Sequence, residues 1–270
     1  MAKPFCKWAG GKGQLLEDIL VRSPKKYGVY YEPFLGGGAV FFGLQPARAV
    51  LSDLNKELMR CYRVVRDDVQ SLIVWLKRYA TKTDEAAYYQ VRGRYARPMT
   101  AVQAAGRFIY LNRLCFNGLY RVNSDGVFNV PYGRYKNPTI CNTENLLACS
   151  AALNKTALSS GDFGVACRLA EQGDFVYLDP PFRPVQDGPN ASFTQYQADG
   201  FDDAQHVRLA ESFRDMDNRG CKILMSNSDH PLVRKLYKGF RIERVYARRN
   251  INSDGTGRGT VPELLIRNYA

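Results

Sequence analysis

The sequence predicts an α/β protein built on a Rossmann-like sheet, with a helical segment inserted into it. A strand, a glycine turn and a helix follow one another near the N-terminus, and short buried strands return after residue 155. Between them, residues 67–110 carry helix-forming patterns and no strand pattern. We therefore expect one sheet that is formed by two separate stretches of the chain.

The first half of the sheet is expected to be a β-α-β unit. Residues 29–34 are typical of a strand, the glycines after them of a turn, and residues 39–44 of a short helix. A second strand over residues 49–52 ends on Asp53 and leads into a helix over residues 56–66. This order is typical of the opening of a parallel sheet.

The inserted segment is expected to be helical, with a break at Arg97-Pro98, because the residue before a proline disfavours the helical conformation. It closes with residues 112–135, where Asn123-Ser124-Asp125-Gly126 predicts a hairpin-like turn.

The sheet pattern then resumes. A helix is expected near residues 202–218. The expected strands cover residues 156–158, 174–178 and 221–225, and a terminal pair covers residues 241–247 and 263–269. The predicted domains are a sheet domain of residues 1–55 and 139–270 and an inserted helical domain of residues 56–138.

Charge is the clearest deviation from an average composition. The 38 Lys and Arg residues against 26 Asp and Glu give a net charge of +12, which suits phosphate backbones. No apolar run approaches the roughly 18 residues that a membrane span needs, and the N-terminus lacks a signal-peptide stretch. We therefore expect a cytoplasmic protein that binds nucleic acid and through it associates with the nucleoid. A monomer in solution is a separate expectation, and oligomerisation on nucleic acid is open.

The cysteines and histidines exclude several kinds of chemistry. Seven cysteines are scattered without a C-x-x-C pair, and the chain has two histidines. This pattern argues against a disulfide framework, a zinc site and a histidine-based catalytic triad. We expect buried cysteines, no metal, and chemistry that relies on carboxylates, amides, aromatic rings and backbone.

The most specific feature is Asp179-Pro180-Pro181-Phe182, directly after a predicted buried strand. An amino nitrogen conjugated to an aromatic base is a poor nucleophile, because its lone pair is delocalised into the ring. Asp179 and a proline carbonyl can accept hydrogen bonds from such an amino group and orient it toward a sulfonium methyl, while Phe182 stacks on the base. The alternative is a proline-stiffened loop with a capping Asp.

The glycine turn is a second candidate site. Phe34-Leu35-Gly36-Gly37-Gly38 lets a ligand approach the backbone, although its spacing matches neither the dinucleotide nor the phosphate-loop pattern. Asp53 ends the next strand, where an acid can bind ribose hydroxyls. The alternatives are an ordinary tight turn and a helix N-cap at Asp53.

Several motifs together resemble the Dam family of DNA adenine N6-methyltransferases. They are Asp179 to Phe182, Glu32 to Gly38, the start with Phe5, Lys7, Trp8 and Lys12, and the stretch 112–135, which is similar to that family's recognition hairpin. The resemblance covers residues 5–269, and it implies that the domain of residues 1–55 and 139–270 is the catalytic methyltransferase domain and that residues 56–138 are the target-recognition domain. It implies methyl transfer from S-adenosylmethionine to a flipped adenine in double-stranded DNA, within GATC, with S-adenosylhomocysteine as the product.

The resemblance also implies a set of cofactor contacts. Phe34, Gly36 and Asp53 match the contacts to methionine and ribose, and Asp162 and Phe163 match the pair that reads the cofactor's adenine. The full set is Trp8, Lys12, Phe34, Gly36, Gly38, Asp53, Asp162, Phe163 and Asp179. Core aromatic residues at Trp8 and Phe34 and a solvated charge at Lys12 are the alternatives.

For DNA, Phe116 and Asn117 match residues that fill the gap left by the flipped base. Arg121 matches a residue that reads a guanine edge. The other implied DNA contacts are Lys7, Leu119, Asn123, Pro131, Arg134 and Tyr135, with Lys136 available for phosphates. The alternative for the hairpin is a structural turn with a solvated arginine.

The chain departs from the family at Phe182 and Phe116, where Tyr is common, and at Tyr120, where small residues are tolerated, so the flanking-base preference is open. The loops 183–200 and 248–258 match loosely and are expected to be mobile until DNA binds. A methyltransferase for RNA adenine, cytosine N4 or protein glutamine, or a catalytically silent DNA-binding relative, remains an alternative. Replication and repair, restriction-modification and a phage function are all open as biological roles.

Overall fold

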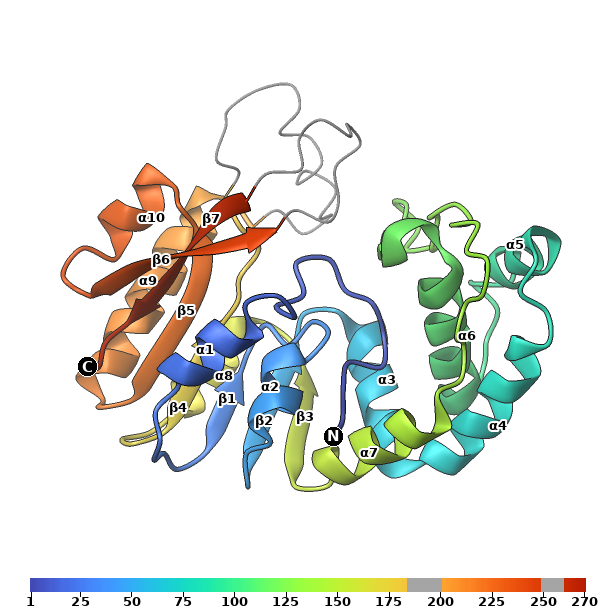
Figure 1. Ribbon diagram of the computed structural model, residues 1–270, viewed down its shortest axis with the longest axis horizontal. Coiled ribbons are helices and arrows are strands. Elements are labelled where there is room, and N and C mark those ends of the chain that lie inside the picture. The colour runs from blue at the N-terminus through green and yellow to red at the C-terminus, as the bar shows by residue number, and fades with distance from the viewer. Residues whose placement is uncertain (184–200, 249–259) are drawn as a thin grey trace. The chain divides into compact units, whose positions relative to one another are not determined.

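The computed structural model describes residues 1–183, 201–248 and 260–270. Within these residues, seven strands form a mixed sheet in the order β3-β2-β1-β4-β5-β7-β6 (Figure 1). The strands are β1 (Tyr30–Glu32), β2 (Ala49–Asp53), β3 (Thr156–Ser160), β4 (Phe175–Leu178), β5 (Lys222–Ser228), β6 (Arg241–Arg248) and β7 (Thr260–Arg267). An order that reverses at the first strand is typical of Rossmann-like sheets, so the predicted fold class is confirmed.

The helices are α1 (Leu16–Arg22), α2 (Ala39–Leu44), α3 (Lys56–Asp67), α4 (Val69–Ala80), α5 (Glu85–Gly93), α6 (Ala101–Leu114), α7 (Thr143–Leu153), α8 (Phe163–Leu169), α9 (Asp203–Asn218), α10 (Pro231–Leu236) and the 3-10 turn η1 (Phe116–Gly118). The expected helices over residues 39–44, 56–66 and 202–218 are present as α2, α3 and α9, and the expected helical segment holds α4, α5 and α6. The sequence did not predict α1, α7, α8 and α10. No helix in the described ranges is long and apolar enough to cross a membrane.

The chain divides into two compact units. Unit 1 consists of Met1–Gly11, Gly36–Gln45 and Asn55–Ser160, and unit 2 of Lys12–Leu35, Pro46–Leu54 and Gly161–Ala270. These units are defined by packing, whereas the predicted domains, residues 1–55 with 139–270 and residues 56–138, are defined by function. The functional division stays a prediction.

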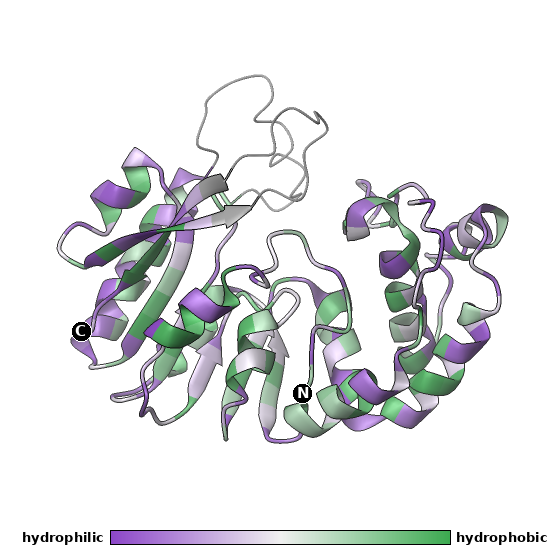
Figure 2. Cartoon of the chain, viewed as in Figure 1, coloured by the Kyte–Doolittle hydropathy of each residue, from purple (hydrophilic) through white to green (hydrophobic). Residues whose placement is uncertain are grey.

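Unit 1 is built around α6, which packs against α3, α4 and α5. Its start has a capping box, in which Thr100 and Gln103 each bond the other's backbone amide. The predicted break at Arg97-Pro98 is confirmed, because it lies between α5 and α6. The helices carry hydrophobic faces toward one another and hydrophilic faces elsewhere (Figure 2), so burial of apolar side chains stabilises this unit.

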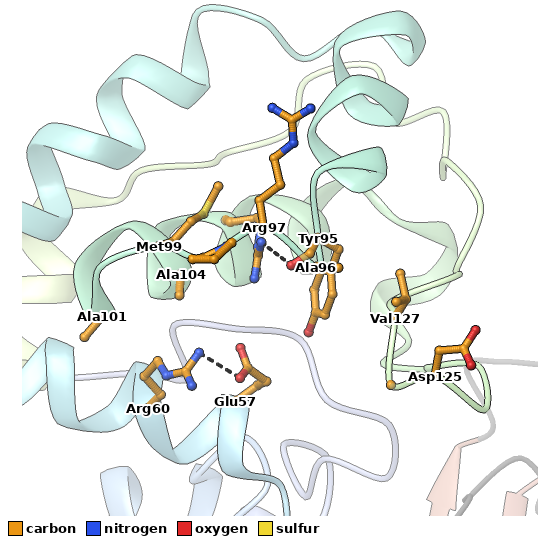
Figure 3. Close-up of a pocket in the computed structure, with 13 residues that line it drawn as sticks. Glu57, Arg60, Tyr95, Ala96, Arg97, Met99, Ala101, Ala104, Asp125 and Val127 are labelled. Atoms are coloured by element: carbon orange, nitrogen blue, oxygen red, sulfur yellow. Dashed lines mark hydrogen bonds and ion pairs between the residues drawn. The ribbon is translucent and has the colours of Figure 1, made fainter.

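A pocket of about 560 Å³ opens in unit 1 beside the hairpin turn (Figure 3). Its wall holds an ion pair between Glu57 and Arg60, with 2.7 Å between the nearest oxygen and nitrogen. The guanidinium of Arg107 lies over the ring of Tyr95 at 4.3 Å and donates to its backbone carbonyl. None of the residues that line this pocket is among the predicted site residues.

In unit 2, β1 pairs in parallel with β2 and β4, and β4 pairs in parallel with β5. The last strand, β7, runs antiparallel to both β5 and β6. Because β1, β2 and β4 are parallel, their carboxyl ends meet at one edge of the sheet. Phe34 and Asp179 follow two of these strands and Asp53 ends the third, so the sheet alone brings these predicted residues to a common edge.

One face of this sheet is covered by α8, α9 and α10. The helix α9 contributes Leu209, Phe213 and Met216, which lie on one side of the helix and are fully buried against residues such as Ile223 of β5. The core face is therefore apolar, and the polar side chains that carry chemistry lie elsewhere.

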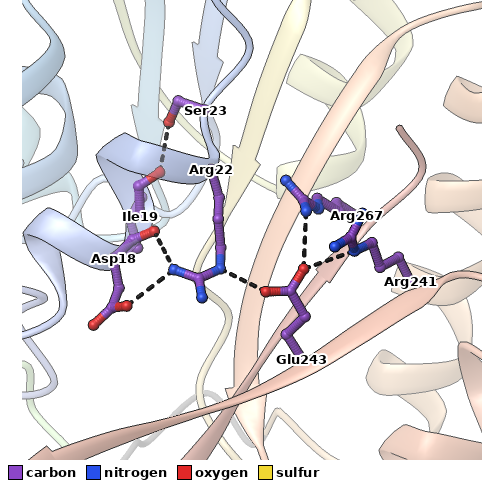
Figure 4. A network of polar contacts seen from close by, with 7 residues as sticks. All are labelled: Asp18, Ile19, Arg22, Ser23, Arg241, Glu243 and Arg267. Atoms are coloured by element: carbon purple, nitrogen blue, oxygen red, sulfur yellow. Dashed lines mark hydrogen bonds and ion pairs between the residues drawn. The ribbon is translucent and has the colours of Figure 1, made fainter. Parts of the chain in front are cut away.

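A network of arginines fixes α1 to the terminal strands (Figure 4). Glu243 on β6 accepts from Arg22 at 2.8 Å through one oxygen and from Arg241 at 2.8 Å and Arg267 at 2.9 Å through the other. The hydrogen bond from Arg22 is the main reason that the pKa of Glu243 is lowered. The network holds α1, and with it the segment that begins at Lys12, against β6 and β7.

Candidate active site and recognition hairpin

Asp179 begins the loop that leaves β4, a strand in which all four residues are buried. Its Oδ1 forms an ion pair with Lys12 Nζ at 2.8 Å and accepts a hydrogen bond from Ser226 Oγ at 2.9 Å. Lys12 is 6% exposed, so the alternative of a solvated charge at this position is wrong. The structure thus brings together two predicted residues that are separated by most of the chain.

Burial raises the pKa of Asp179, and Lys12 and Ser226 act in the opposite direction. A carboxylate removed from water favours its neutral form, whereas a nearby cation and hydrogen-bond donors favour the charged form. Only the charged form accepts hydrogen bonds through every lone pair. The two partners therefore preserve the acceptor ability of this carboxyl group.

Two residues that sequence reasoning did not find support Asp179. The hydroxyls of Ser226 on β5 and Tyr177 on β4 lie 2.8 Å apart. Because the Ser226 proton goes to Asp179, the Tyr177 hydroxyl donates to Ser226. Their only signal in the sequence is that polar residues interrupt two strongly apolar strands.

A further carboxyl group, that of Glu263, was also missed. It lies on β7 opposite Ser228 of β5, and its Oε2 is buried without a hydrogen-bond partner among the described residues. Burial raises the pKa of Glu263, Lys12 lowers it and Asp179 raises it again. The group therefore lies within electrostatic range of the pair formed by Lys12 and Asp179.

The remaining residues of the Asp-Pro-Pro-Phe motif lie around this pair. Pro180 is buried and Phe182 is half-buried. The Lys12 ammonium lies over the Phe182 ring, 4.6 Å from its centroid. The ring is thus held beside the carboxylate by the same lysine that binds it.

A group of three phenylalanine rings lies at the expected nucleoside site of unit 2. Phe34 stacks on Phe163, with 5.3 Å between the ring centroids, and Phe201 contacts both rings. Asp162 caps α8 and forms an ion pair with Arg208 at 2.5 Å, which lowers the pKa of Asp162. Sequence reasoning missed Phe201 and Arg208, because nothing in their local sequence marks them.

Asp53 lies beside this group. The amide of Gly161 donates to the backbone oxygen of Asp53 at 3.1 Å, so the segment that leads to Asp162 runs along the end of β2. The N-cap of α3 is Asn55, whose side chain accepts from the Leu58 amide. The alternative of an N-cap at Asp53 is therefore wrong.

The glycine turn belongs to unit 1 and requires its glycines. Gly36 and Gly38 have φ angles of +48° and +70°, which side chains rarely adopt. A Cβ atom on Gly36 would lie 2.7 Å from Trp8, and one on Gly38 would lie 2.6 Å from the Tyr62 hydroxyl. That hydroxyl donates to the Gly36 carbonyl at 3.0 Å, so Tyr62 is a further residue that sequence reasoning missed.

The predicted hairpin is present as isolated bridges between Val122 and Phe128 and between Cys115 and Tyr132. In the turn, the side-chain oxygen of Asn123 accepts from the amides at positions 125 and 127. Arg121 donates from Nε to the side chain of Asn129 at 2.7 Å. Asn123 thus shapes the turn, and Asn129 orients the arginine.

The other predicted DNA contacts lie around the hairpin. Phe116 is 49% exposed, which is unusual for a large apolar ring, and Asn117 has a left-handed φ of 54°. Lys7 lies over the ring of Tyr135 at 3.6 Å. Half-buried Leu119 and exposed Pro131, Arg134 and Lys136 complete the set.

Comparison with known proteins settles the family. The sequence profile of the D12 class N6 adenine-specific DNA methyltransferases matches residues 8–251. The chain belongs to this family. The match spans the glycine turn, the hairpin and the Asp-Pro-Pro-Phe motif, and the resemblance seen in the sequence is confirmed.

Individual family members match along nearly the whole chain. Type II methyltransferases of Lactococcus lactis subsp. cremoris and Methanocaldococcus jannaschii are each 42% identical and cover 99% of this chain, which spans 95% and 99% of their lengths. The DNA adenine methylase of Escherichia coli is 34% identical over 97% of this chain and 94% of its own length. Relatives of both the type II and the Dam kind are therefore similar to this D12 methyltransferase.

Three other expectations can be compared with the structure. Six of the seven cysteines are buried, Cys141 is half-buried, and none of them forms a disulfide. Among the described residues, no group of three or more His, Cys, Asp or Glu side chains could hold a metal ion. The loops expected to be mobile, 183–200 and 248–258, lie outside the described residues except at 183 and 248.

Proposed function

We propose that this chain transfers a methyl group from S-adenosylmethionine to the N6 amino group of a flipped adenine in double-stranded DNA, within GATC. Acting on DNA, the enzyme would work in the cytoplasm at the nucleoid, as a monomer. The observation that carries the proposal is the geometry at Asp179, whose Oδ1 binds Lys12 and Ser226. Both described contacts fall on one oxygen, which leaves Oδ2 as an acceptor for the substrate.

The chemistry requires an amino group with an available lone pair. Asp179 Oδ2 accepts a hydrogen bond from N6 and draws electron density back onto that nitrogen. The carbonyl of Pro180 is a second acceptor, fixed by the stiff Pro180-Pro181 backbone, and Phe182 stacks on the base. S-adenosylmethionine, when bound, supplies a methyl group on a sulfonium. The methyl group would pass from sulfur to N6, S-adenosylhomocysteine would leave as the thioether, and the proton lost from N6 would pass to water.

The cofactor contacts in the proposal suit a nucleoside with a charged tail. In unit 2, Phe163 and Asp162 keep the role at the cofactor's adenine that the family motif implies, and Asp53 offers an acceptor for ribose hydroxyls. Phe34 stacks on the Phe163 ring, and Arg208 lies over that ring and holds Asp162. Lys12 and Phe34 belong to the same unit. In unit 1, Trp8, Gly36 and Gly38 keep the role that the family motif implies, and the two glycines make room for the Trp8 indole and the Tyr62 hydroxyl.

The DNA contacts in the proposal divide into contacts to bases and contacts to phosphates. Phe116 is exposed enough to enter the gap that a flipped base leaves, with Asn117 beside it. Arg121 reads a guanine edge, and Lys7 contacts the first G·C pair. Leu119 and Pro131 contact a thymine methyl, Tyr135 and Asn123 support the hairpin on DNA, and Arg134 and Lys136 contact phosphates.

The proposal is tested by transfer of a labelled methyl group from S-adenosylmethionine to duplexes that differ only in one site. We expect methylated adenine in a duplex with GATC and little in a duplex with the same bases in another order. Sequencing of methylated adenines in DNA from cells that express the chain checks the site independently. Methylation elsewhere refutes GATC alone, whereas transfer to RNA, cytosine or protein but not to DNA refutes the substrate.

Replacement of Arg121 by alanine is expected to relax recognition at one base pair. A bidentate contact between arginine and guanine contributes about 1–3 kcal/mol of discrimination, so preference at that pair should fall roughly 10- to 100-fold. The measurement is the ratio of kcat/KM on GATC to that on sites substituted at each position. The matched control is Lys136→Ala, which should weaken binding to all duplexes alike. Unchanged selectivity in Arg121→Ala contradicts the assignment.

A further inference from the structure

We propose that Tyr120 is a positioning residue that couples DNA binding at the hairpin to cofactor binding at the glycine turn. The inference rests on the proposed function, because that function places DNA on the hairpin and the cofactor at the turn. All the residues that carry it belong to unit 1. Tyr120 lies directly before Arg121, the residue proposed to read guanine.

A ring stack joins the hairpin to Trp8. The rings of Tyr120 and Trp8 lie 5.9 Å apart with 25° between their planes. The indole of Trp8 in turn lies so close to Gly36 that a Cβ atom there would be 2.7 Å from its Cδ1 and 3.1 Å from its Nε1. Trp8 is therefore in contact with the recognition hairpin through one ring and with the glycine turn through its edge.

Other aromatic rings support the Tyr120 ring. Its centroid lies 5.4 Å from that of Phe108 of α6 and 5.9 Å from that of Phe128 of the opposite hairpin arm. Its hydroxyl lies 3.3 Å from that of Tyr95. Because the Tyr120 ring is packed against both hairpin arms, its position follows that of the arms.

The contacts of Tyr120 link the motion of the hairpin to that of the glycine turn. A ligand that restricts the hairpin restricts Tyr120 and, through the stack, Trp8 and the Gly36 turn. The second ligand then meets a turn that is already ordered, so it loses less conformational entropy on binding. Linkage makes the effect reciprocal, so cofactor binding strengthens DNA binding by the same factor. The residue type also matters, since a small side chain at position 120 cannot reach Trp8.

Trp8 provides its own reporter. The chain has two tryptophans, so Trp75→Phe leaves Trp8 as the only one. In this background, dissociation constants for S-adenosylhomocysteine are measured with and without a saturating GATC duplex. S-adenosylhomocysteine is the reaction product and carries no methyl group to transfer, so no turnover occurs. We expect the duplex to tighten its binding roughly 10-fold, within the range usual for coupled sites, and to change Trp8 emission even before S-adenosylhomocysteine is added.

Tyr120→Leu should reduce this coupling to less than about 2-fold and abolish the response of Trp8 emission to the duplex, because the stack is lost. Tyr120→Phe, which keeps the ring and loses the hydroxyl, should retain both. Tyr79→Leu is the matched control, since it removes a stacked ring of the same unit that contacts Tyr110 and neither Tyr120 nor Trp8. It should retain the coupling at any measured loss of thermal stability.

Two results overturn the inference. One is coupling in folded Tyr120→Leu equal to that of the parent, and the other is absence of coupling in the parent itself. Failure of the proposed function is distinguishable from both, because it appears in the parent as no methyl transfer to the duplex. A parent that methylates the duplex but shows independent binding of the two ligands refutes the coupling and leaves the function intact.

Discussion

Replacement of Asp179 by alanine is expected to lower the single-turnover rate of methyl transfer at least about 10²- to 10³-fold, the loss usual when a polarising group is removed from a reacting centre. The loss follows because Oδ2 of Asp179 is the proposed acceptor for the amino group, and alanine offers no acceptor in its place. The measurement is incorporation of a labelled methyl group into a GATC duplex. Affinity for the cofactor should change little.

Stability must be separated from chemistry in this experiment. Removing Asp179 leaves the buried ammonium of Lys12 without its counter-ion, and breaking a buried pair in this way costs about 3–5 kcal/mol of folding free energy. The double variant Asp179→Ala with Lys12→Met removes both charges and should recover much of that stability. It should remain inactive. An active Asp179→Ala enzyme would sink the assignment of this residue.

Replacement of Lys12 by methionine is expected to move the acid limb of the pH–rate profile to higher pH. Burial already raises the pKa of Asp179, and Lys12 lowers it, so without the lysine the pKa rises further. A carboxyl group with a raised pKa is active above that pKa, and its activity is lost as the pH falls through it. At neutral pH the rate should fall roughly 10²-fold, as expected for loss of a charged partner at a reacting group. Single-turnover rates across the acid and neutral range provide the test.

Two neighbours serve as controls for the origin of this shift. Ser226→Ala removes a hydrogen bond to Asp179 and should move the limb in the same direction by less. Glu263→Gln removes a carboxyl group whose pKa is raised by burial and which lies near the pair formed by Lys12 and Asp179. If the limb follows Glu263 rather than Lys12 and Ser226, Asp179 is not the group that titrates. An acid limb unchanged in Lys12→Met leads to the same conclusion.

The sequence was sufficient for the architecture and for the local parts of the site. Apolar runs such as residues 174–178 predicted buried strands, because this pattern is local and does not depend on the place of the strand in the sheet. The glycine turn was also predictable, because the φ angles of Gly36 and Gly38 are a local requirement. The residues of the Asp-Pro-Pro-Phe motif are adjacent in sequence, so their common site needed no tertiary information.

The tertiary structure decided which distant residues support those motifs. Lys12 and Ser226 meet at Asp179 only because the parallel strands bring the end of β4 beside β5 and the segment before α1. No local pattern encodes such a meeting, since it depends on strand order and register. In the same way, Arg208 became a partner of Asp162 through the packing of α9 against α8.

Tyr120 shows the difference most clearly. In the sequence it is a hairpin residue whose size departs from the family and leaves the flanking-base preference open, whereas the structure packs its ring against Trp8, Phe108 and Phe128. Residue type and spacing determined where the fold's strands and glycines lie, because those are properties of short segments. Which side chains touch was determined by packing of segments far apart in the chain, and the coupling proposed for Tyr120 depends entirely on such contacts.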